Sequence, residues 1–558
     1  MVLLFSRLDM LDAKRMSIIR YDNVIRYLLP LTLFLFSLIP RSLDLGTGLI
    51  FDEQYWLERS PAFFDAVLAQ EWGQTRFSGH PGVTTMWLSG LSIFFFKIPE
   101  MGFPEFLTIS RLPIVSVTSL GILVSYYLLI KIFDRKTAFL SCILMALDPF
   151  FIAHSRFIHL DAMTTTWMML AVLSFFVYLH QSSKLYIVFT GIFTGLAVLT
   201  KLPALFLLMY IPLALLLWSL LNSQRNGESL LNALISKEIW FEITKNASLV
   251  ILIASIIYFL LFPVMWVNPG TEILKSISGV KSAIYNPHDN GGFFLGKAND
   301  GNNGPLFYPI IILMRSTPFT IIFFFTGVIY LFSRLRYKLE NRRDIFILLS
   351  GIFCLLFTLQ MGLSLKAFDR YILPIFPFIC IIASYGFWNV ITTIWQLLRL
   401  SGSQKRMKKL YNYKIIIPSL ILVCAIVQLC QIIPIAPYYN SYYNPICGGS
   451  HLAQKTLLIG WGEGNDIAAK YLNQKPNAQN LTVGVQYPGF SQYFIGKSVP
   501  ISQDADYYIF YISMIQRERN LDIWERYKEK DPEKIIRLNG INYVWIYRSN
   551  VTDEGKPL

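Results

Sequence analysis

Long apolar runs separated by short polar segments dominate the first 435 residues of the chain. A helix needs about 20 apolar residues to cross a bilayer, so runs of this length predict membrane-spanning helices. A shorter run, VTTMWLSGLSIFFF at 83–96, predicts an interfacial or re-entrant helix instead. The eleven runs that predict spanning helices lie near residues 23–40, 111–131, 136–153, 162–180, 184–200, 202–222, 247–267, 310–333, 344–363, 371–396 and 414–434.

Basic residues between these runs predict the orientation of the chain, because cytoplasmic loops are enriched in Lys and Arg. With the N-terminus inside, the basic clusters all fall on the cytoplasmic side, whereas a full crossing by 83–96 would move every later cluster outside. We therefore expect the N-terminus inside and the C-terminus outside. The clusters are Lys131, Arg135 and Lys136; Lys184; Arg225, Lys237 and Lys245; Arg334, Arg336, Lys338, Arg342 and Arg343; and Arg399, Lys405, Arg406, Lys408, Lys409 and Lys414.

The overall composition agrees with a membrane protein. Of the 558 residues, 54% are hydrophobic and 15% are charged, whereas soluble domains carry about 25% charged residues. The net charge of +14 is compatible in principle with a nucleic-acid partner. Because the basic residues cluster between apolar runs, cytoplasmic loops explain the charge better, and no nucleic-acid partner is expected.

The last part of the chain, residues 436–558, has a different pattern from the preceding membrane domain, residues 1–435. Strand-like runs occur at 481–485, 507–512 and 541–547, and a helix is expected at 465–473. This alternation predicts a small α/β domain outside the membrane. Two long segments of the membrane domain are expected on the same outer side: the loop 41–110 and the loop 268–309.

Ionisable side chains gather on the predicted outer side. An ionisable side chain at membrane depth costs free energy, so such residues usually have a function. A pair of cations there can stabilise a phosphate, and a carboxylate can accept a proton from a hydroxyl. A lipid-linked sugar phosphate would present its phosphate at this depth. The residues are Asp52 and Glu53 in FDEQYW, His80 in SGHPGVTTMW, Arg156, His159 and Asp161 in HSRFIHLD, and Lys366 and Arg370 in SLKAFDR.

The same residues also have structural interpretations. Arg156 and Asp161 are suited to an ion pair at a helix end, and Lys366 and Arg370 to lipid headgroup contacts at a membrane surface. Asp369 is expected to orient the neighbouring Arg370. These alternatives do not explain why carboxylates and cations gather on one side of the membrane.

The order of FDEQYW, GHPGVTTMW, HSRFIHLD and LKAFDRYILPIFP resembles the GT-C glycosyltransferases. The most similar group is the bacterial type of the dolichyl/polyprenyl-phosphate-mannose protein O-mannosyltransferase family (glycosyltransferase family 39), which is related to the aminoarabinose transferases. PYYNSYYNPICGG (437–449) and IGWGEGNDIAAKYLN (459–473) resemble an extension in bacterial members. The resemblance implies an all-α polytopic fold that transfers a hexose, most often mannose, from a polyprenyl phosphate to an acceptor hydroxyl with inversion.

The resemblance also implies roles for the individual residues. Asp52 would be the general base, and Glu53 would position the acceptor or the base. His80 stands in HPG, where the family commonly has His-Pro-Pro. The implied acceptor or second-carboxylate site is His80, His159 and Asp161, and the implied donor phosphate site is Arg156, Lys366 and Arg370.

No cofactor is required by this mechanism, although an oxygen-rich pair such as Asp52 and Asp161 also suits a divalent Mg²⁺ or Mn²⁺ ion. The segment 268–309 is too short for the β-trefoil of eukaryotic relatives and predicts a mobile flap over the site. The acceptor stays open between a protein, a lipid and a glycan. We expect a multi-pass protein of the bacterial plasma (inner) membrane with its site on the extracytoplasmic face.

Two other classes of function are compatible with a polytopic chain. A transporter or flippase for a lipid-linked glycan needs polar residues along a path through the membrane midplane, and the candidate residues lie mostly on one side. A structural scaffold has no evident use for clustered outer carboxylates and cations.

Overall fold

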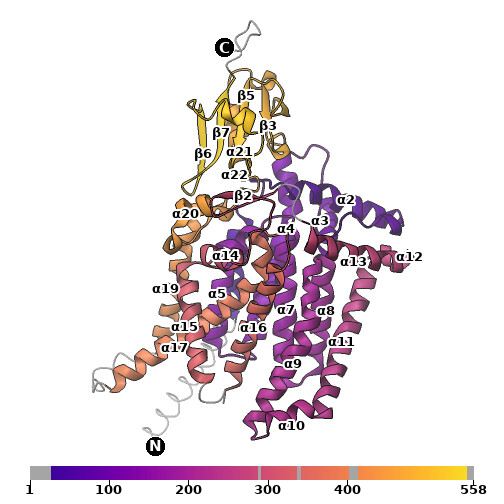
Figure 1. Ribbon diagram of the computed structural model, residues 1–558, viewed down its shortest axis with the longest axis vertical. Helices are drawn as coiled ribbons and strands as arrows, with labels where there is room; N and C mark the ends of the chain where they lie inside the picture. Colours follow the sequence, from indigo (N-terminus) through magenta and orange to yellow (C-terminus); the bar gives the residue numbers. More distant parts are fainter. Residues whose placement is uncertain (1–26, 287–290, 336–340, 401–412, 550–558) are drawn as a thin grey trace, which may run out of the picture.

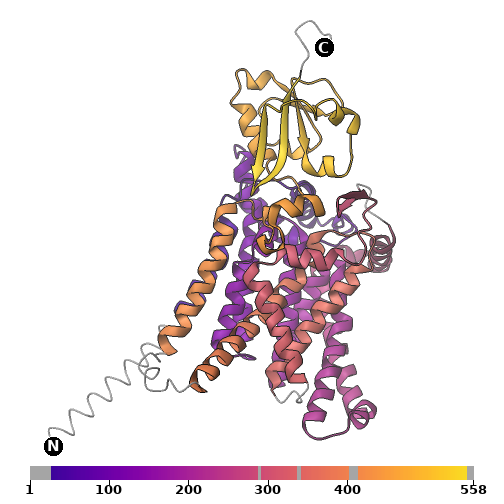
Figure 2. The same ribbon diagram turned by 60° about the vertical axis from the view of Figure 1, so that its left-hand side comes forward.

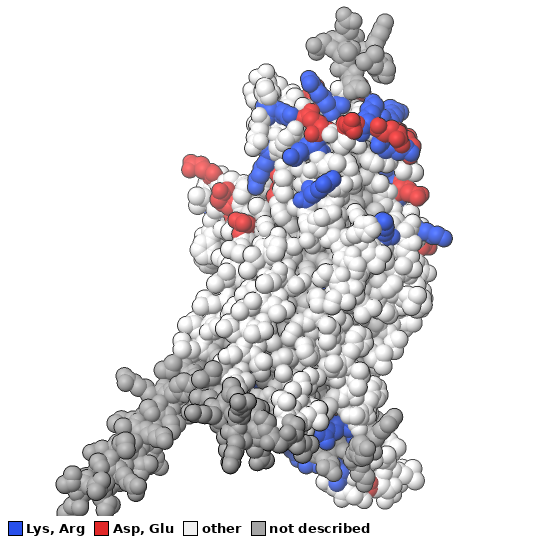
Figure 3. All heavy atoms as spheres, turned by 90° about the vertical axis from the view of Figure 1, so that its left-hand side faces the viewer, with Lys and Arg blue, Asp and Glu red and all other residues white. Residues whose placement is uncertain are grey.

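The computed structural model describes residues 27–286, 291–335, 341–400 and 413–549. Its helices form an elongated bundle, and the C-terminal sheet domain sits on one end of that bundle (Figures 1 and 2). On the face drawn in Figure 3, charged side chains gather over the C-terminal domain and at the opposite end. A broad surface without charged residues separates the two groups, as expected for a membrane-embedded bundle.

Eight of the described helical segments are long and apolar enough to cross a membrane, and a bent pair of helices adds a ninth. Two shorter apolar helices, Tyr27–Ser42 and α8 (Lys184–Thr200), correspond to the remaining predicted runs. Two central helices, α7 and α17, are almost completely buried. The long helices are α4 (Phe103–Leu129), α7 (Leu160–Gln181), α9 (Phe206–Arg225), α11 (Lys237–Leu261), α15 (Pro318–Leu335), α16 (Arg342–Gly362), α17 (Phe376–Leu400) and α19 (Tyr413–Ile432).

Prolines interrupt two of the runs that predict continuous spans. The run 136–153 divides into α5 (Arg135–Ala146) and α6 (Pro149–Ser155), which are bent by 60°. The run 310–333 divides between α14 (Phe307–Arg315) and α15, because Pro318 begins the second helix. Proline lacks an N–H group and disfavours helical backbone in the residue before it, so both expectations of an unbroken helix are wrong.

Three helices lie across the end of the bundle that carries the C-terminal domain (Figure 1). They are α2 (Glu53–Leu68), α3 (Val83–Phe96), which matches the predicted interfacial or re-entrant segment, and α13 (Pro269–Tyr285). Of these, α2 and α13 extend to one side of the C-terminal domain (Figure 1). The segment 268–309, expected as a flap loop, contains α13 and a hairpin of β1 (Gly292–Phe294) and β2 (Lys297–Asn299). Most of that segment is therefore regular structure.

The C-terminal domain contains a five-stranded mixed sheet of order β4-β3-β5-β7-β6. Three of its strands, β3 (Thr482–Val485), β5 (Tyr507–Tyr511) and β7 (Ile541–Arg548), and its helix α21 (Asn465–Asn473) fall on the predicted runs. The edge strands are β4 (Lys497–Pro500) and β6 (Lys534–Leu538). The remaining short helices are α10 (Leu230–Ile235), α12 (Val264–Val267), α20 (Gly449–Thr456), α22 (Ile512–Gln516) and α23 (Leu521–Glu525).

Backbone hydrogen bonds attach the C-terminal domain to the outer segments of the bundle. The N–H of Phe51 donates to the carbonyl of Trp461 at 2.7 Å, and the N–H of Leu295 donates to the carbonyl of Thr456 at 2.8 Å. The first bond directly precedes Asp52. The C-terminal domain therefore helps to position the start of α2.

Candidate active site

Helix α2 presents one of its faces to a cavity of about 380 Å³ at the end of the bundle. Asp52 is the N-cap residue of α2, and Tyr55, Trp56 and Arg59 follow it at helical spacing. Residues three, four and seven positions apart lie on the same face of a helix. This spacing explains why all four side chains line the cavity.

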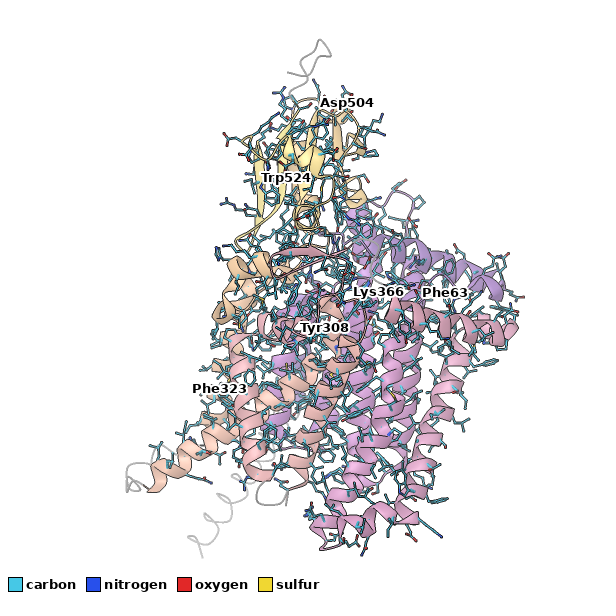
Figure 4. The ribbon with its side chains drawn as sticks, viewed as in Figure 1. Phe63, Tyr308, Phe323, Lys366, Asp504 and Trp524 are labelled. Carbon is cyan, nitrogen blue, oxygen red and sulfur yellow. The ribbon has the colours of Figure 1, made fainter. Side chains whose placement is uncertain are left out.

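The cavity combines polar groups with an apolar part. Leu160, Pro203, Phe357 and Met361, which belong to the helical bundle, provide apolar lining. Lys366, which is marked in Figure 4, lies where the bundle meets the outer segments. The acidic, basic and histidine residues that line the cavity are Asp52, Arg59, His80, His159, Asp161, Lys201, Lys366 and Arg370.

A network of charged side chains connects Asp52 with Asp161. Arg370 donates from Nη2 to Oδ2 of Asp52 at 3.0 Å, and its Nε lies 3.5 Å from Oδ2 of Asp161. His159 lies between the same carboxylates, with Nε2 3.6 Å from Asp52 and Nδ1 2.9 Å from Asp161. Lys201 donates to the other oxygen of Asp161 at 2.6 Å. The carboxylates are thus held in place by three neighbouring side chains.

Asp52 is the more accessible of these two carboxylates. Its side chain is 28% exposed, compared with 4% for Asp161. Burial alone would raise the pKa of Asp52, but the interaction with His159 and the charge of Arg370 outweigh burial and hold this pKa well below its ordinary value. Asp52 is therefore an ionised oxygen acceptor at the edge of the cavity.

Glu53 lies next to Asp52 in the chain but does not line the cavity. Its side chain is fully buried and accepts two hydrogen bonds from Arg111, at 2.7 and 2.5 Å, and one from the N–H of Ile158 at 2.8 Å. These contacts connect the start of α2 to α4 and to the turn before α7. In this arrangement Glu53 can position the base, because its contacts fix the start of α2.

Arg156, expected at the donor phosphate, does not line the cavity either. It is buried and donates to the backbone carbonyls of Pro40, Arg41 and Asp44 at 3.0–3.2 Å. These carbonyls lie at the end of the first described helix, where they lack helical partners. The structure thus places Arg156 in a structural role, and Asp161 pairs with Lys201 instead of Arg156.

His80 and Lys366 do line the cavity, as the sequence predicts. Burial and the charge of Lys201 lower the pKa of His80 to about 3, so its imidazole is neutral. In the described part of the chain, no carboxylate lies within ion-pair distance of Lys366. Lys366 is therefore a cation with room for an anionic ligand.

Asp52 and Asp161 do not form a fitting site for a divalent metal ion in this arrangement. Arg370 and His159 occupy the space between the carboxylates, and Lys201 binds the remaining oxygen of Asp161. Within the described residues, no group of three or more His, Cys, Asp or Glu side chains is placed to hold a metal. No step of the chemistry below uses a metal.

Several contributions to the site are not evident from the motifs. Arg59 was missed, although its seven-residue spacing from Asp52 is the signal that identifies it. Trp461 comes from the C-terminal domain. The centroid of its ring lies 4.1 Å from Cζ of Arg370 and 4.9 Å from the centroid of the His159 ring. Asp369 binds Arg315 through Oδ2, and its Oδ1 accepts a hydrogen bond from the backbone N–H of Arg370 at 2.7 Å, so it can orient Arg370 as expected.

These features together define a polytopic membrane protein with a carboxylate and several cations in a cavity at one end of its bundle. Residues 53–269 match the family model described as dolichyl-phosphate-mannose-protein mannosyltransferase. This range includes His80, His159 and Asp161, and it begins one residue after Asp52. The predicted resemblance to this family is confirmed.

Several solved structures are similar to the chain. ArnT from Cupriavidus metallidurans, determined with bound undecaprenyl phosphate, has a TM-score of 0.51 and 14% identity over 95% of this chain and 99% of that chain. The oligosaccharyltransferase AglB from Archaeoglobus fulgidus has a TM-score of 0.48 and 12% identity over 88% and 70% of the two chains. The Pmt1-Pmt2 complex of S. cerevisiae has a TM-score of 0.34 and 21% identity over 42% and 33%.

The similarity to ArnT shows the GT-C fold over nearly the full length of both chains. None of the curated proteins compared with the chain matches it significantly in sequence. The family model matches less than half of the chain, and the similarity to ArnT is a similarity of fold.

Proposed function

We propose that the protein is an inverting glycosyltransferase that moves a hexose, mannose first among the candidates, from a polyprenyl phosphate to an acceptor hydroxyl. The observation that carries this proposal is the cavity in which the partly exposed carboxylate of Asp52 lies beside Arg370 and which Lys366 also lines. The match of residues 53–269 to a mannosyltransferase family supports mannose. ArnT binds undecaprenyl phosphate, which supports a polyprenyl phosphate in this cavity.

In the proposed reaction, the carboxylate of Asp52 accepts the proton of the acceptor hydroxyl. The hydroxyl oxygen forms a bond to the anomeric carbon on the face opposite the phosphate. The bond between the anomeric carbon and the phosphate oxygen breaks, and its electron pair leaves with the polyprenyl phosphate. Because attack and departure occur on opposite faces, the configuration at this carbon inverts.

Lys366 and Arg370 stabilise the negative charge that grows on the leaving phosphate. Arg370 is held by Asp52 and Asp161, so its position is fixed before the donor binds. The apolar lining of Phe357, Met361 and Leu160 accommodates the first part of the lipid tail. Glu53 acts as a positioning residue because its contacts fix the start of α2.

The positive-inside rule favours the extracytoplasmic face of a plasma membrane for this site. Figure 3 shows basic side chains at the end of the bundle opposite the C-terminal domain. Arg334, Arg343 and Lys136 line a separate cavity away from Asp52. We therefore place the donor phosphate, the acceptor and the C-terminal domain together outside the cell.

The test uses purified protein in nanodiscs and a panel of radiolabelled polyprenyl-phosphate sugars: mannose, glucose, galactose and an aminosugar. Wild type should release polyprenyl phosphate from one donor, whereas Asp52→Asn should reduce this rate about 10²- to 10⁴-fold because the general base is lost. Asp504→Asn is the matched control, since Asp504 lies exposed on the C-terminal domain (Figure 4).

Equal release by wild type and Asp52→Asn would refute Asp52 as the base. NMR of the product with an added acceptor reports the anomeric configuration, and retention would refute direct displacement. The donor that turns over identifies the sugar. Activity without added Mg²⁺ or Mn²⁺ and in the presence of a chelator is expected for a reaction that uses no metal.

A further inference from the structure

A second cavity, of about 340 Å³, lies between the outer segments of the bundle and the C-terminal domain. Only two residues of the described chain, Asp52 and Arg370, line both this cavity and the one proposed for the donor. The second cavity therefore meets the first at the proposed base. A hydroxyl in the second cavity and a sugar in the first would both lie beside Asp52.

The second cavity is rich in positive charge. Four arginines and two aspartates line it. Arg315 donates to Asp369 at 2.5 and 3.0 Å, and Arg370 donates to Asp52, so both aspartates have a partner. Arg517, by contrast, has no carboxylate within ion-pair distance in the part of the chain that the structure describes.

The position of Arg517 suits a ligand contact better than a structural one. Arg517 follows α22 in the C-terminal domain, and its Nε is buried without a hydrogen-bond partner among the described residues. A buried donor of this kind is costly unless a partner occupies the site. An anionic group in the cavity would supply that partner.

Two other polar groups of the cavity are hydrogen-bond acceptors that a ligand hydroxyl group could satisfy. Neither Oδ1 of Asn440 nor Oε1 of Gln486 receives a hydrogen bond within the described residues. The orientation of Asn440 is fixed, because its Nδ2 donates to Glu463 at 2.6 Å. The rings of Trp461 and Tyr487 add aromatic surface to the lining. Acceptor oxygens beside aromatic rings are suited to a sugar, which has many hydroxyl groups and apolar ring faces.

We propose that this second cavity binds the acceptor, and that the acceptor is a saccharide that carries a carboxylate or phosphate group. Arg517 binds the anionic group, Asn440 and Gln486 accept hydrogen bonds from hydroxyl groups, and one hydroxyl faces Asp52. The C-terminal domain is thereby the part of the chain that selects the acceptor. The assignment of this ligand as acceptor rests on the proposed glycosyltransferase function, whereas its binding to the cavity does not.

The binding test uses saturation-transfer NMR on the full chain in nanodiscs with three matched probes: glucose, glucuronic acid and glucose 6-phosphate. Wild type should bind one or both anionic sugars at least 10-fold more tightly than glucose, because a hydrogen bond between charged groups is stronger than one between neutral groups. The two anionic probes separate a carboxylate ligand from a phosphate ligand. Arg517→Gln should remove this preference, and Arg517→Lys should largely retain it.

Two further variants test which of the two cavities binds the anionic group of the sugar. Arg526→Gln changes an exposed arginine of the same domain outside the cavity and should bind as wild type does. Lys366→Gln changes the donor cavity and should also retain the preference. Loss with Lys366→Gln but not with Arg517→Gln would place the anion in the donor cavity and overturn the proposal, as would equal binding of all three sugars.

Donor turnover separates the failure of this proposal from the failure of the proposed function. With water as the acceptor, wild type and Arg526→Gln should release polyprenyl phosphate at the same rate, and an anionic sugar should stimulate both of them but not Arg517→Gln. Donor turnover without any preference for anionic sugars would overturn the acceptor assignment alone. Competition by an acidic serine peptide with no sugar binding would replace the saccharide by a peptide and would likewise overturn it.

Discussion

Asp52 and Glu53 are adjacent in the chain, yet the structure gives them different roles, and Glu53→Ala is the change that separates these roles. Glu53 is fully buried and receives hydrogen bonds from Arg111 and Ile158. Removing its carboxylate leaves the guanidinium of Arg111 buried without a counter-charge. The main effect of Glu53→Ala should therefore be on folding stability.

The magnitude follows from the burial of both partners, since each side chain of the pair is 0% exposed. Breaking a buried ion pair by removing one partner costs about 3–5 kcal/mol. Arg111 also donates to the carbonyls of Leu45, Thr47 and Gly48, and these bonds survive the substitution. The loss should therefore fall near the lower end of this range.

Thermal unfolding of the purified protein measures this effect, with Glu58→Ala as the matched control. Glu58 is exposed on the same helix, and its substitution should change the stability by less than about 0.5 kcal/mol. Asp52→Asn should reduce transfer about 10²- to 10⁴-fold while it leaves the unfolding temperature near that of wild type. If Glu53→Ala unfolds like wild type and loses only transfer, Glu53 contacts the substrate and the structural role derived above is refuted.

Three other changes test the site and its connection to the C-terminal domain. Since the pKa of Asp52 is held below its ordinary value, the base stays ionised as the pH falls, and kcat/KM should stay level from pH 7 to about pH 5. His159→Asn removes one interaction that lowers this pKa, so the acid limb should move up by roughly one pH unit; an unchanged pH profile would contradict the assignment. Lys366→Gln should lower kcat/KM for the donor about 10- to 100-fold, because a contact with the phosphate is lost. Steady-state kinetics measure this value, and a kcat/KM equal to that of wild type would contradict the role of Lys366 as a phosphate ligand. Gly462 has φ +138°, and a Cβ there would lie 2.3 Å from a backbone carbonyl oxygen of the segment before α2. Gly462→Ala should thus cost about 1–3 kcal/mol in thermal unfolding, whereas Gly351→Ala, with nothing within 4 Å of its Cβ, should not.

Much of the fold is predictable because burial in a membrane demands long apolar runs. The runs locate the helices of the bundle, and β-branched and aromatic clusters locate β3, β5 and β7. The helix breaks at Pro149 and Pro318 have a local signal that the prediction of continuous spans overlooked, since proline interrupts helices by a local mechanism. The edge strands β4 and β6 are less predictable, because short strands with mixed polar residues resemble loops.

The candidate site was predictable only in part, because polar motifs identify residues but not their partners. Asp52, His159 and Arg370 do converge. Nothing local distinguishes the exposed Asp52 from the buried Glu53, since that difference depends on Arg111 in another helix. Likewise Arg156 resembles a phosphate ligand in sequence, and only the nearby end of a helix in space makes it a partner for backbone carbonyls.

The contact of the two cavities at Asp52 and Arg370 has a consequence for inhibitor design. A single molecule that joins a lipid phosphate mimic to an anionic sugar would occupy both cavities at once, and the second part would bind at a high effective concentration. A protonated amine at the junction of the two parts would lie beside the ionised carboxylate of Asp52 and could form an ion pair with it. Such a compound would have to be short, because the same two side chains border both cavities.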